Sequence, residues 1–337
     1  MRVYQTKEIR NIAIVGSTRS GKTTLTEAMI YEGGLITRKG SVEEKNTVSD
    51  YRPIELERQS SVVASVLYTE YNNIKINMID NPGVDDFVGE VAPSLSICDV
   101  VFLLLNAQNG IEIGTEINYR NIKKYDIPFV LVVNQLDHER ANFEETINQA
   151  RNLFGKKVTV LQYPVNQGPG FNSVVDILSM KMYKYPVGGK LEIVEIPDSE
   201  KAKAEELRNI LCENAAESEE SLMEKFFDKG ELSNEEIIEG LKKGIISKSL
   251  SPVLCVSAKN NTGVSLLLDF IKEVIPSPGE MPMAKDINGN EIKCDSHSEM
   301  EFNPETMEVV VYIRKDKDKL LKQEKYKFKD GVFVKVE

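Results

Sequence analysis

The sequence predicts an α/β fold built on a mainly parallel sheet with helices on both faces, and three observations support this. Strand-like runs alternate with helical patterns over the first 154 residues. Two runs, VVFLLLN (100–106) and PFVLVVN (128–134), are continuously apolar, as expected of strands buried on both sides. The β-branched run IRNIAIV (9–15) leads through a glycine-bounded loop into a helical pattern, TTLTEAMIYE. Alternation of this kind is typical of βαβ units.

The same reasoning gives the order of the elements along the chain. After the first strand we expect strands at 62–68, 74–80, 100–106, 129–134 and 252–257. Helices are expected between several of them, at 114–125, 143–154 and 263–275. We divide the chain into a main domain (1–154 and 251–276), an inserted α+β subdomain (155–250), a proline-rich linker (277–284) and a short β-rich tail of unknown role (285–337). Within the tail, the Asp-Gly of KFKDGVFV indicates a hairpin.

Composition excludes several classes of function. A net charge of −11 and a pI near 5.0 argue against binding to free DNA or RNA. No apolar run approaches the roughly 18 residues of a membrane span. The first residues pass directly into a strand pattern without the features of a secretory or transit leader, so we expect no membrane association and a cytoplasmic location. The four cysteines are widely spaced, which disfavours a zinc site or a disulfide framework.

The segment GSTRSGKT (16–23) fits the phosphate-binding pattern G-x-x-x-x-G-K-[ST] and lies between a predicted strand and a predicted helix. Its glycines allow backbone N–H groups to surround phosphate, and the helix N-terminus favours negative charge. Lys22 is expected to reach the β- and γ-phosphates, and Thr23 to bind Mg²⁺ through its hydroxyl. The residues expected to hold the phosphates are Gly16, Ser17, Thr18, Arg19, Ser20, Gly21, Lys22, Thr23 and Thr24. The fold class is therefore that of a P-loop NTPase.

Asp80 ends the strand at 74–80 and begins the segment DNPG, where it is placed to act on Mg²⁺ through water. Gly83, three residues later, is free to offer its N–H to a γ-phosphate. The pattern D-x-x-G is common by itself. Its position after the phosphate-binding loop makes it informative.

Two later segments point to the base. VVNQLD (132–137) resembles the guanine-reading Asn-Lys-x-Asp element of GTPases, with Asn134, Gln135 in the place of Lys, and Asp137. A carboxylate at that place accepts hydrogen bonds from N1–H and the exocyclic amine of guanine, which adenine does not supply. CVSAK (255–259) lies at the end of the strand expected at 252–257 and adds three candidate base-site residues, Ser257 as a brace for Asp137, Ala258 as a donor to the guanine oxygen, and Lys259.

These motifs in this order resemble the G domain of the translational GTPases, and specifically that of elongation factor G. The resemblance runs from about Lys7 to Met283 and is densest in GKTTLTE, ERQSSV, DNPGVDDF, NQLD, LMEKFFDKGELSNEEI and SPVLCVSAKNNTGV. The span 155–250 corresponds to the insert typical of that factor. The opening is also similar to ribosomal protection proteins of the tetracycline-resistance kind. The resemblance implies Mg²⁺, GTP or GDP as ligands and the ribosome as a partner.

Two departures from the family pattern concern the metal and the phosphates. In ERQSSV, Ser61 stands where the family has a switch Thr, which keeps a hydroxyl for Mg²⁺ but loses the stiffness of a β-branched side chain. The metal ligands implied are therefore Thr23, Ser61 and Asp80. Arg19 replaces a family Asp that holds a monovalent cation. It is open whether Arg19 acts as an internal arginine finger or, as we favour, points to solvent. Lys22 and Arg19 are the candidate catalytic residues.

The third departure concerns hydrolysis. DNPGVDDF resembles the family's DTPGHVDF, so Val84 stands where the catalytic His orients the attacking water. Val has no hydrogen-bonding group in its side chain, and loss of such positioning costs on the order of 10²–10⁴ in rate. His138 and His297 are the two histidines, and neither is an evident substitute. The resemblance also ends near the linker, and the tail from Lys285 does not match the family's next domain.

The sequence therefore predicts a GTP-binding, elongation factor G-like protein with low GTPase turnover. The alternative from another class is a non-hydrolysing GTP-binding module that acts on the ribosome in a protective or regulatory way. A relic that binds no nucleotide and an ATP-specific P-loop protein are two further alternatives. Asn134 with Asp137 disfavours the ATP-specific one.

Overall fold

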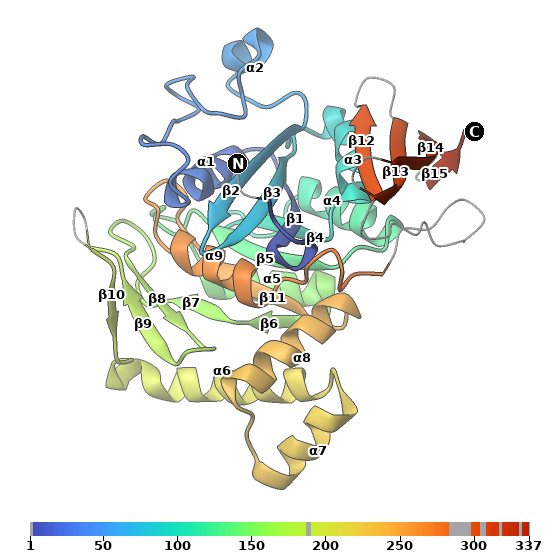
Figure 1. The fold of residues 1–337 in the computed structure, drawn as a ribbon. Coiled ribbons are helices and arrows are strands. Elements are labelled where there is room, and N and C mark those ends of the chain that lie inside the picture. The colour runs from blue at the N-terminus through green and yellow to red at the C-terminus, as the bar shows by residue number, and fades with distance from the viewer. Residues whose placement is uncertain are drawn as a thin grey trace. The chain divides into compact units, whose positions relative to one another are not determined.

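The computed structural model describes residues 3–186, 190–282, 298–303, 308–316, 319–329 and 332–336, and the chain divides into two compact units, Met1–Gly279 and Glu280–Glu337. The larger unit is centred on a seven-stranded sheet in the order β2-β3-β1-β4-β5-β11-β6 (Figure 1). Its strands are β1 (Ile9–Gly16), β2 (Ser65–Tyr71), β3 (Ile74–Asp80), β4 (Val100–Asn106), β5 (Phe129–Asn134), β6 (Val158–Val160) and β11 (Ser251–Cys255). Every neighbouring pair is parallel except β2 and β3, so the predicted mainly parallel sheet is confirmed.

Helices cover both faces of this sheet. All seven residues of β4 and all six of β5 are buried, and since alternate residues of a strand point to opposite faces, neither face is open to solvent there. α1 packs against α9, and α3 and α4 both contact β1. The helices around the sheet are α1 (Lys22–Glu32), α3 (Val88–Ile97), α4 (Ile113–Lys124), α5 (Phe143–Phe154) and α9 (Val264–Glu273), with short helices η1 (Thr6–Glu8), α2 (Pro53–Arg58) and η2 (Asp85–Phe87).

The second strand begins later than the sequence predicts. We expected it at 62–68, whereas β2 begins at Ser65. The reason lies in the preceding residues, because the backbone N–H groups of Val62 and Val63 both donate to Oε1 of the buried Glu55, at 3.1 and 3.2 Å. These two residues are therefore held by a side chain and not by a strand partner.

The span expected as an insert begins with a strand of the central sheet, β6, beside β11. The chain then forms a separate four-stranded antiparallel sheet and three helices. α6 and α8 contact β6 and β11 respectively, at that edge of the main sheet (Figure 1). These elements are β7 (Gln162–Pro164), β8 (Ser173–Asp176), β9 (Lys181–Lys184), β10 (Glu192–Val194), α6 (Asp198–Ala216), α7 (Glu220–Lys229) and α8 (Asn234–Ile246).

The smaller unit contains an antiparallel four-stranded sheet, β12 (Ser298–Asn303), β13 (Glu308–Asp316), β14 (Lys319–Lys329) and β15 (Val332–Lys335). β14 and β15 pair on either side of Asp330 and Gly331, so the predicted hairpin is confirmed, although those two residues lie outside the described part of the chain. Among the described residues of both units, we find no helix that is long and apolar enough to cross a membrane.

Candidate functional site

The site lies at the carboxyl ends of β1, β3, β5 and β11, where the loops that follow these parallel strands meet. The phosphate-binding loop joins β1 to α1, and Gly21 at its end has a φ of +89°, in the left-handed region that favours glycine. A Cβ atom at Gly21 would lie 2.3 Å from Nδ2 of Asn134. Backbone strain and close packing therefore both require glycine there.

Lys22 begins α1 and turns back under the loop. Its Nζ donates to the carbonyl oxygens of Gly16 and Ser17 at 3.0 and 2.8 Å, and the side chain is buried. Burial lowers the pKa of Lys22 from its ordinary value to about 8, against the opposing effect of Asp80, Glu112 and Asp50. A buried ammonium group of this kind gains strongly from an anion placed beside it.

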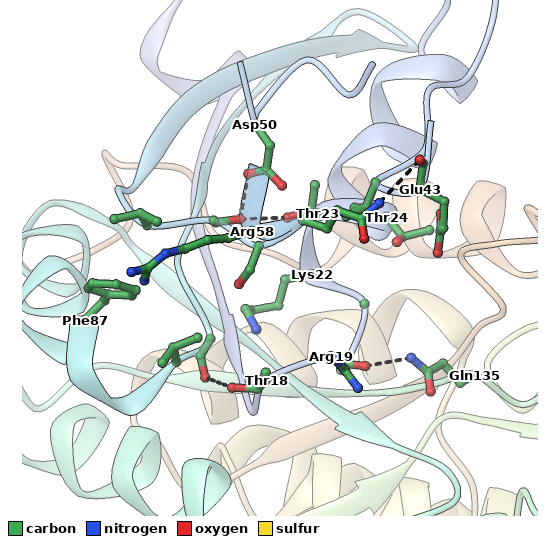
Figure 2. Close-up of a pocket in the computed structure, with 18 residues that line it drawn as sticks. Thr18, Arg19, Lys22, Thr23, Thr24, Glu43, Asp50, Arg58, Phe87 and Gln135 are labelled. Atoms are coloured by element: carbon green, nitrogen blue, oxygen red, sulfur yellow. Dashed lines mark hydrogen bonds between the residues drawn. The ribbon is translucent and has the colours of Figure 1, made fainter. Parts of the chain in front are cut away.

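A chain of hydroxyl and carboxyl groups runs beside Lys22. Thr23 and Ser61 place their Oγ atoms 3.1 Å apart, and the Ser61 hydroxyl donates to Oδ1 of Asp50 at 2.7 Å (Figure 2). Asp80 is the last residue of β3 and is 1% exposed. Burial raises its pKa to about 6, and the Thr23 hydroxyl and the Lys22 ammonium oppose that rise.

These groups fit a hydrated Mg²⁺ ion. Neither carboxylate oxygen of Asp80, nor Oδ2 of Asp50, has a hydrogen-bond partner among the described residues, although all three atoms are buried. Buried oxygens without partners are costly unless a cation or water satisfies them. Hydroxyl and carboxylate oxygens are the donors that Mg²⁺ prefers, with water and phosphate completing its coordination. Thr23 and Ser61 would hold the ion directly, and Asp80 and Asp50 would act through water.

Asp50 is absent from the sequence prediction. It lies in the long connection between α1 and α2, where no strand or helix periodicity marks a functional side chain. Burial raises its pKa, and the hydrogen bond from Ser61 opposes the rise. Its place beside Ser61 depends on a fold of the loop that sequence spacing does not encode.

The residues expected to read the base come together beside the phosphate-binding loop. Asn134 bridges two segments, because its Nδ2 donates to the Ser20 carbonyl at 2.9 Å and its Oδ1 accepts from the Ala258 N–H at 3.0 Å. The expected donor to a guanine oxygen is therefore engaged by Asn134. The Ser257 hydroxyl donates to Oδ1 of Asp137 at 2.7 Å, the bracing contact anticipated from the sequence.

The Gln135 side chain contacts the backbone of Arg19. Gln135 adopts a left-handed conformation (φ +64°), and its Nε2 donates to the Arg19 carbonyl at 2.8 Å (Figure 2). The Arg19 side chain is exposed and lines two neighbouring cavities, of about 690 and 580 Å³. Gln135 lines both cavities as well, so its shorter side chain still reaches the phosphate-binding loop.

The larger cavity extends from the phosphate-binding loop to the segment after β3. Lys22, Thr23, Asp50 and Ser61 line it, together with Thr18, Thr24, Gly83 and Val84. The Thr18 hydroxyl donates to the Gly83 carbonyl at 2.6 Å, which ties the two segments together (Figure 2). Val84 thus presents an apolar side chain to the cavity. His138 is not among its lining residues, and His297 lies outside the described residues.

Comparisons with known proteins agree with this geometry. The model of the elongation factor Tu GTP binding domain matches residues 7–277. Elongation factor G of Mycoplasma pneumoniae (strain ATCC 29342 / M129 / Subtype 1) is 33% identical over 298 residues, which cover 87% of this chain and 43% of that protein. A crystal structure of a protein from Thermus thermophilus superimposes with a TM-score of 0.78 at 27% identity, covering 98% of this chain and 51% of that chain.

This chain spans about half the length of these two proteins, at 43% and 51%. The family match includes every residue of the candidate site, from Gly16 to Lys259. With its parallel sheet, phosphate-binding loop and base-reading segments, the chain belongs to the translational GTPases, the family of the elongation factor Tu GTP binding domain.

Proposed function

We propose that this chain binds Mg²⁺-GTP and Mg²⁺-GDP and acts on the ribosome, in the cytoplasm, as an elongation factor G-like GTPase of low turnover. The observation that carries nucleotide binding is the set of unsatisfied groups around Lys22. The buried Lys22 ammonium and the Asp50 carboxylate line a cavity of about 690 Å³, and the buried carboxylate of Asp80, whose oxygens have no partner in the described structure, acts on Lys22 through its charge. A magnesium-bound polyphosphate supplies the missing charges and ligands to all three groups.

The roles of the residues follow from their contacts. Lys22 exchanges its two carbonyl partners for β- and γ-phosphate oxygens, and the loop amides from Ser17 to Thr24 surround the phosphates. Asp137, braced by Ser257, accepts the N1–H and the exocyclic amine of guanine. Gly83 offers its N–H to the γ-phosphate. When bound, Mg²⁺ neutralises charge that develops on the phosphate oxygens.

Low turnover is supported by the side chain at position 84. Hydrolysis requires a water in line with the γ-phosphate, and a hydrogen-bonding group that orients it contributes on the order of 10²–10⁴ in rate. Val84 lines the cavity and offers no such group. Lys22 and the metal would still stabilise the transferring phosphoryl group. Arg19 lines the same cavity, as does Arg58, and is the cation of the phosphate-binding loop available to assist them.

The apolar side chain of Val84 also favours a second candidate function, a GTP-binding module that does not hydrolyse its ligand. Ser61 contacts Thr23 and Asp50. A bound γ-phosphate and its metal would therefore order the segment that carries Ser61. In this case the bound nucleotide sets a conformation, and the protein occupies a ribosomal surface without turnover.

Two measurements test these proposals. Calorimetry with GDP and excess Mg²⁺ should show binding, and ATP should not compete; absence of heat with GDP would contradict nucleotide binding altogether. Phosphate release from GTP should then be slow and should rise when ribosomes are added. Tight GTP binding without any release, with or without ribosomes, would support the non-hydrolysing module instead.

A further inference from the structure

Lys39, in the connection between α1 and α2, contacts the base-reading part of the site. Its Nζ donates to the carbonyl oxygens of Ala258 and Lys259, at 2.9 and 2.6 Å. These two carbonyls belong to the loop that follows β11 and Ser257. A cation from the segment leading to Ser61 therefore holds the loop that we assign to the guanine base.

The backbone beside Lys39 is fixed in turn. The N–H of Gly40 donates to Oε1 of Glu27 at 2.8 Å, and Glu27 is buried within α1. A Cβ atom at Gly40 would lie 2.4 Å from the Asn46 carbonyl oxygen, so the backbone there is closely packed. Lys39 consequently extends to the base loop from a backbone that is held by a hydrogen bond and by close packing. Within the described part of the chain, it forms no ion pair, and its contacts go to carbonyl groups.

A continuous chain of hydrogen bonds leads from Lys39 to Asp137. The Lys259 carbonyl, which accepts from Lys39, belongs to the same peptide unit as the Asn260 N–H. That N–H donates to Oγ of Ser257 at 3.3 Å, and the Ser257 hydroxyl donates to Oδ1 of Asp137 at 2.7 Å. Successive hydrogen bonds polarise one another, and an ammonium at the start strengthens each donor along the chain.

The electrostatics agree with this geometry. Burial lowers the pKa of Lys39, and the charges of Glu27 and Asp137 oppose the change. The charge of Asp137 thus acts on Lys39, whose hydrogen bonds in the described structure go to the carbonyl groups of Ala258 and Lys259. The chain of bonds occupies one lone pair of Asp137 Oδ1, so Oδ2 and the second lone pair of Oδ1 are available to the two donors of the base.

We propose that Lys39 is a positioning residue for guanine selection, which holds the Ala258–Lys259 carbonyls and, through Asn260 and Ser257, the orientation of Asp137. This inference rests on the proposed nucleotide binding and adds to it a residue outside the recognised motifs. It also links the connection that carries Asp50 to the segment expected to read the base.

The test compares Lys39→Met with Arg38→Met, which removes a neighbouring charge whose side chain is exposed and pairs with Glu44. Calorimetry in excess Mg²⁺ would measure the Kd of three probes, GDP, inosine diphosphate and inorganic pyrophosphate. Inosine diphosphate lacks the exocyclic amine that Asp137 would accept. We expect Lys39→Met to weaken GDP binding about tenfold and to reduce the preference for GDP over inosine diphosphate, because charge-assisted hydrogen bonds are lost.

Pyrophosphate binding should be unchanged in both variants, Arg38→Met should behave as wild type, and Lys39→Arg should restore most of the preference. Equal loss for GDP and pyrophosphate, or an unchanged preference in Lys39→Met while wild type binds GDP, would overturn the role of Lys39 and leave the proposed function standing. Failure of wild type to bind GDP would overturn both. Melting of the nucleotide-free variants checks that each is folded.

Discussion

At the residue scale, Val84 and Asp80 bear on two different properties of the candidate site, hydrolysis and nucleotide binding. Val84 contributes an apolar surface to the cavity next to Gly83. Asp80 contributes two buried oxygens that have no hydrogen-bond partner in the described structure. In the proposed function, Val84 leaves the attacking water without an orienting group, and the oxygens of Asp80 favour a nucleotide bound with its metal. Each makes a separate prediction.

Replacing Val84 with His should raise the rate of phosphate release. The imidazole supplies a hydrogen-bonding group near the expected γ-phosphate, and such a group contributes on the order of 10² or more in rate when it is well placed. The assay is phosphate release from GTP in the presence of ribosomes. Val84→Ala serves as the control, since it changes size without adding a polar group and should not accelerate release. Equal rates for the His and Ala variants would count against the water-orienting account.

Replacing Asp80 with Asn should stabilise the nucleotide-free protein at neutral pH. The folded-state pKa of about 6 lies above the ordinary 3.8, so the charged carboxylate destabilises the folded state fully above pH 6 and not at all below about 3.8. We expect Asp80→Asn to gain about 1–3 kcal/mol at pH 7, since one pKa unit corresponds to about 1.4 kcal/mol.

The measurement is urea unfolding of wild type and Asp80→Asn at pH 7 and at pH 4.5 without nucleotide. The difference in unfolding free energy should shrink at the lower pH, where the wild-type carboxyl is protonated. A variant less stable than wild type at pH 7, or a difference that grows toward pH 4.5, would contradict the assigned burial penalty.

At the scale of elements, buried carboxylates organise the long connection from α1 to β2. Glu27 accepts from the backbone of Gly40 and Val48, and Glu55 accepts from Val62 and Val63 just before β2. Side chains thus supply the partners that regular secondary structure supplies elsewhere. The connection can hold Ser61 beside Thr23 for this reason, and local loss of one carboxylate should loosen it.

Glu27→Gln tests that arrangement. The two carboxylate oxygens of Glu27 accept from Gly40 N–H at 2.8 Å and Val48 N–H at 2.9 Å. In the Gln side chain the amide oxygen replaces only one of them, and the NH₂ group faces the other N–H donor. The variant should lose about 1–3 kcal/mol of stability and be cleaved faster by proteases within residues 33–52. Glu44→Gln, at an exposed position of the same connection, is the control and should match wild type.

At the scale of the whole molecule, the chain consists of two units that divide between Gly279 and Glu280. Every residue of the candidate site lies in the first unit, between Gly16 and Lys259. The central sheet and its buried core also belong to that unit. The second unit is a four-stranded antiparallel sheet, for which we assign no role.

A chain ending at Gly279 should therefore fold and bind GDP with a Kd within about twofold of that of the full chain. Its core is complete, and no site residue is removed. Circular dichroism and calorimetry with GDP make the comparison. A chain that fails to fold, or a Kd weakened tenfold, would mean that the second unit contributes to the first.

The sequence by itself determined the parallel sheet, the phosphate-binding loop and the order of the site segments. Continuous apolar runs mark buried parallel strands, and motifs at their carboxyl ends meet because those ends share one edge of the sheet. The placement of Lys22, Asp80, Asn134 and Asp137 at one edge of the sheet could be predicted for this reason. Local pattern is sufficient where a function depends on residues directly after strands.

Only the tertiary structure decided the rest. Asp50, Glu27 and Lys39 form hydrogen bonds to residues far away in the sequence, which apolar periodicity does not predict. Each of these bonds depends on the path of the connection between α1 and α2. The start of β2 and the entry of β6 into the central sheet were decided in the same way, by partners brought together in space. Hydrogen bonds between distant segments carry no signal in the local pattern of apolar and polar residues, because that pattern reports burial and not the identity of the partner.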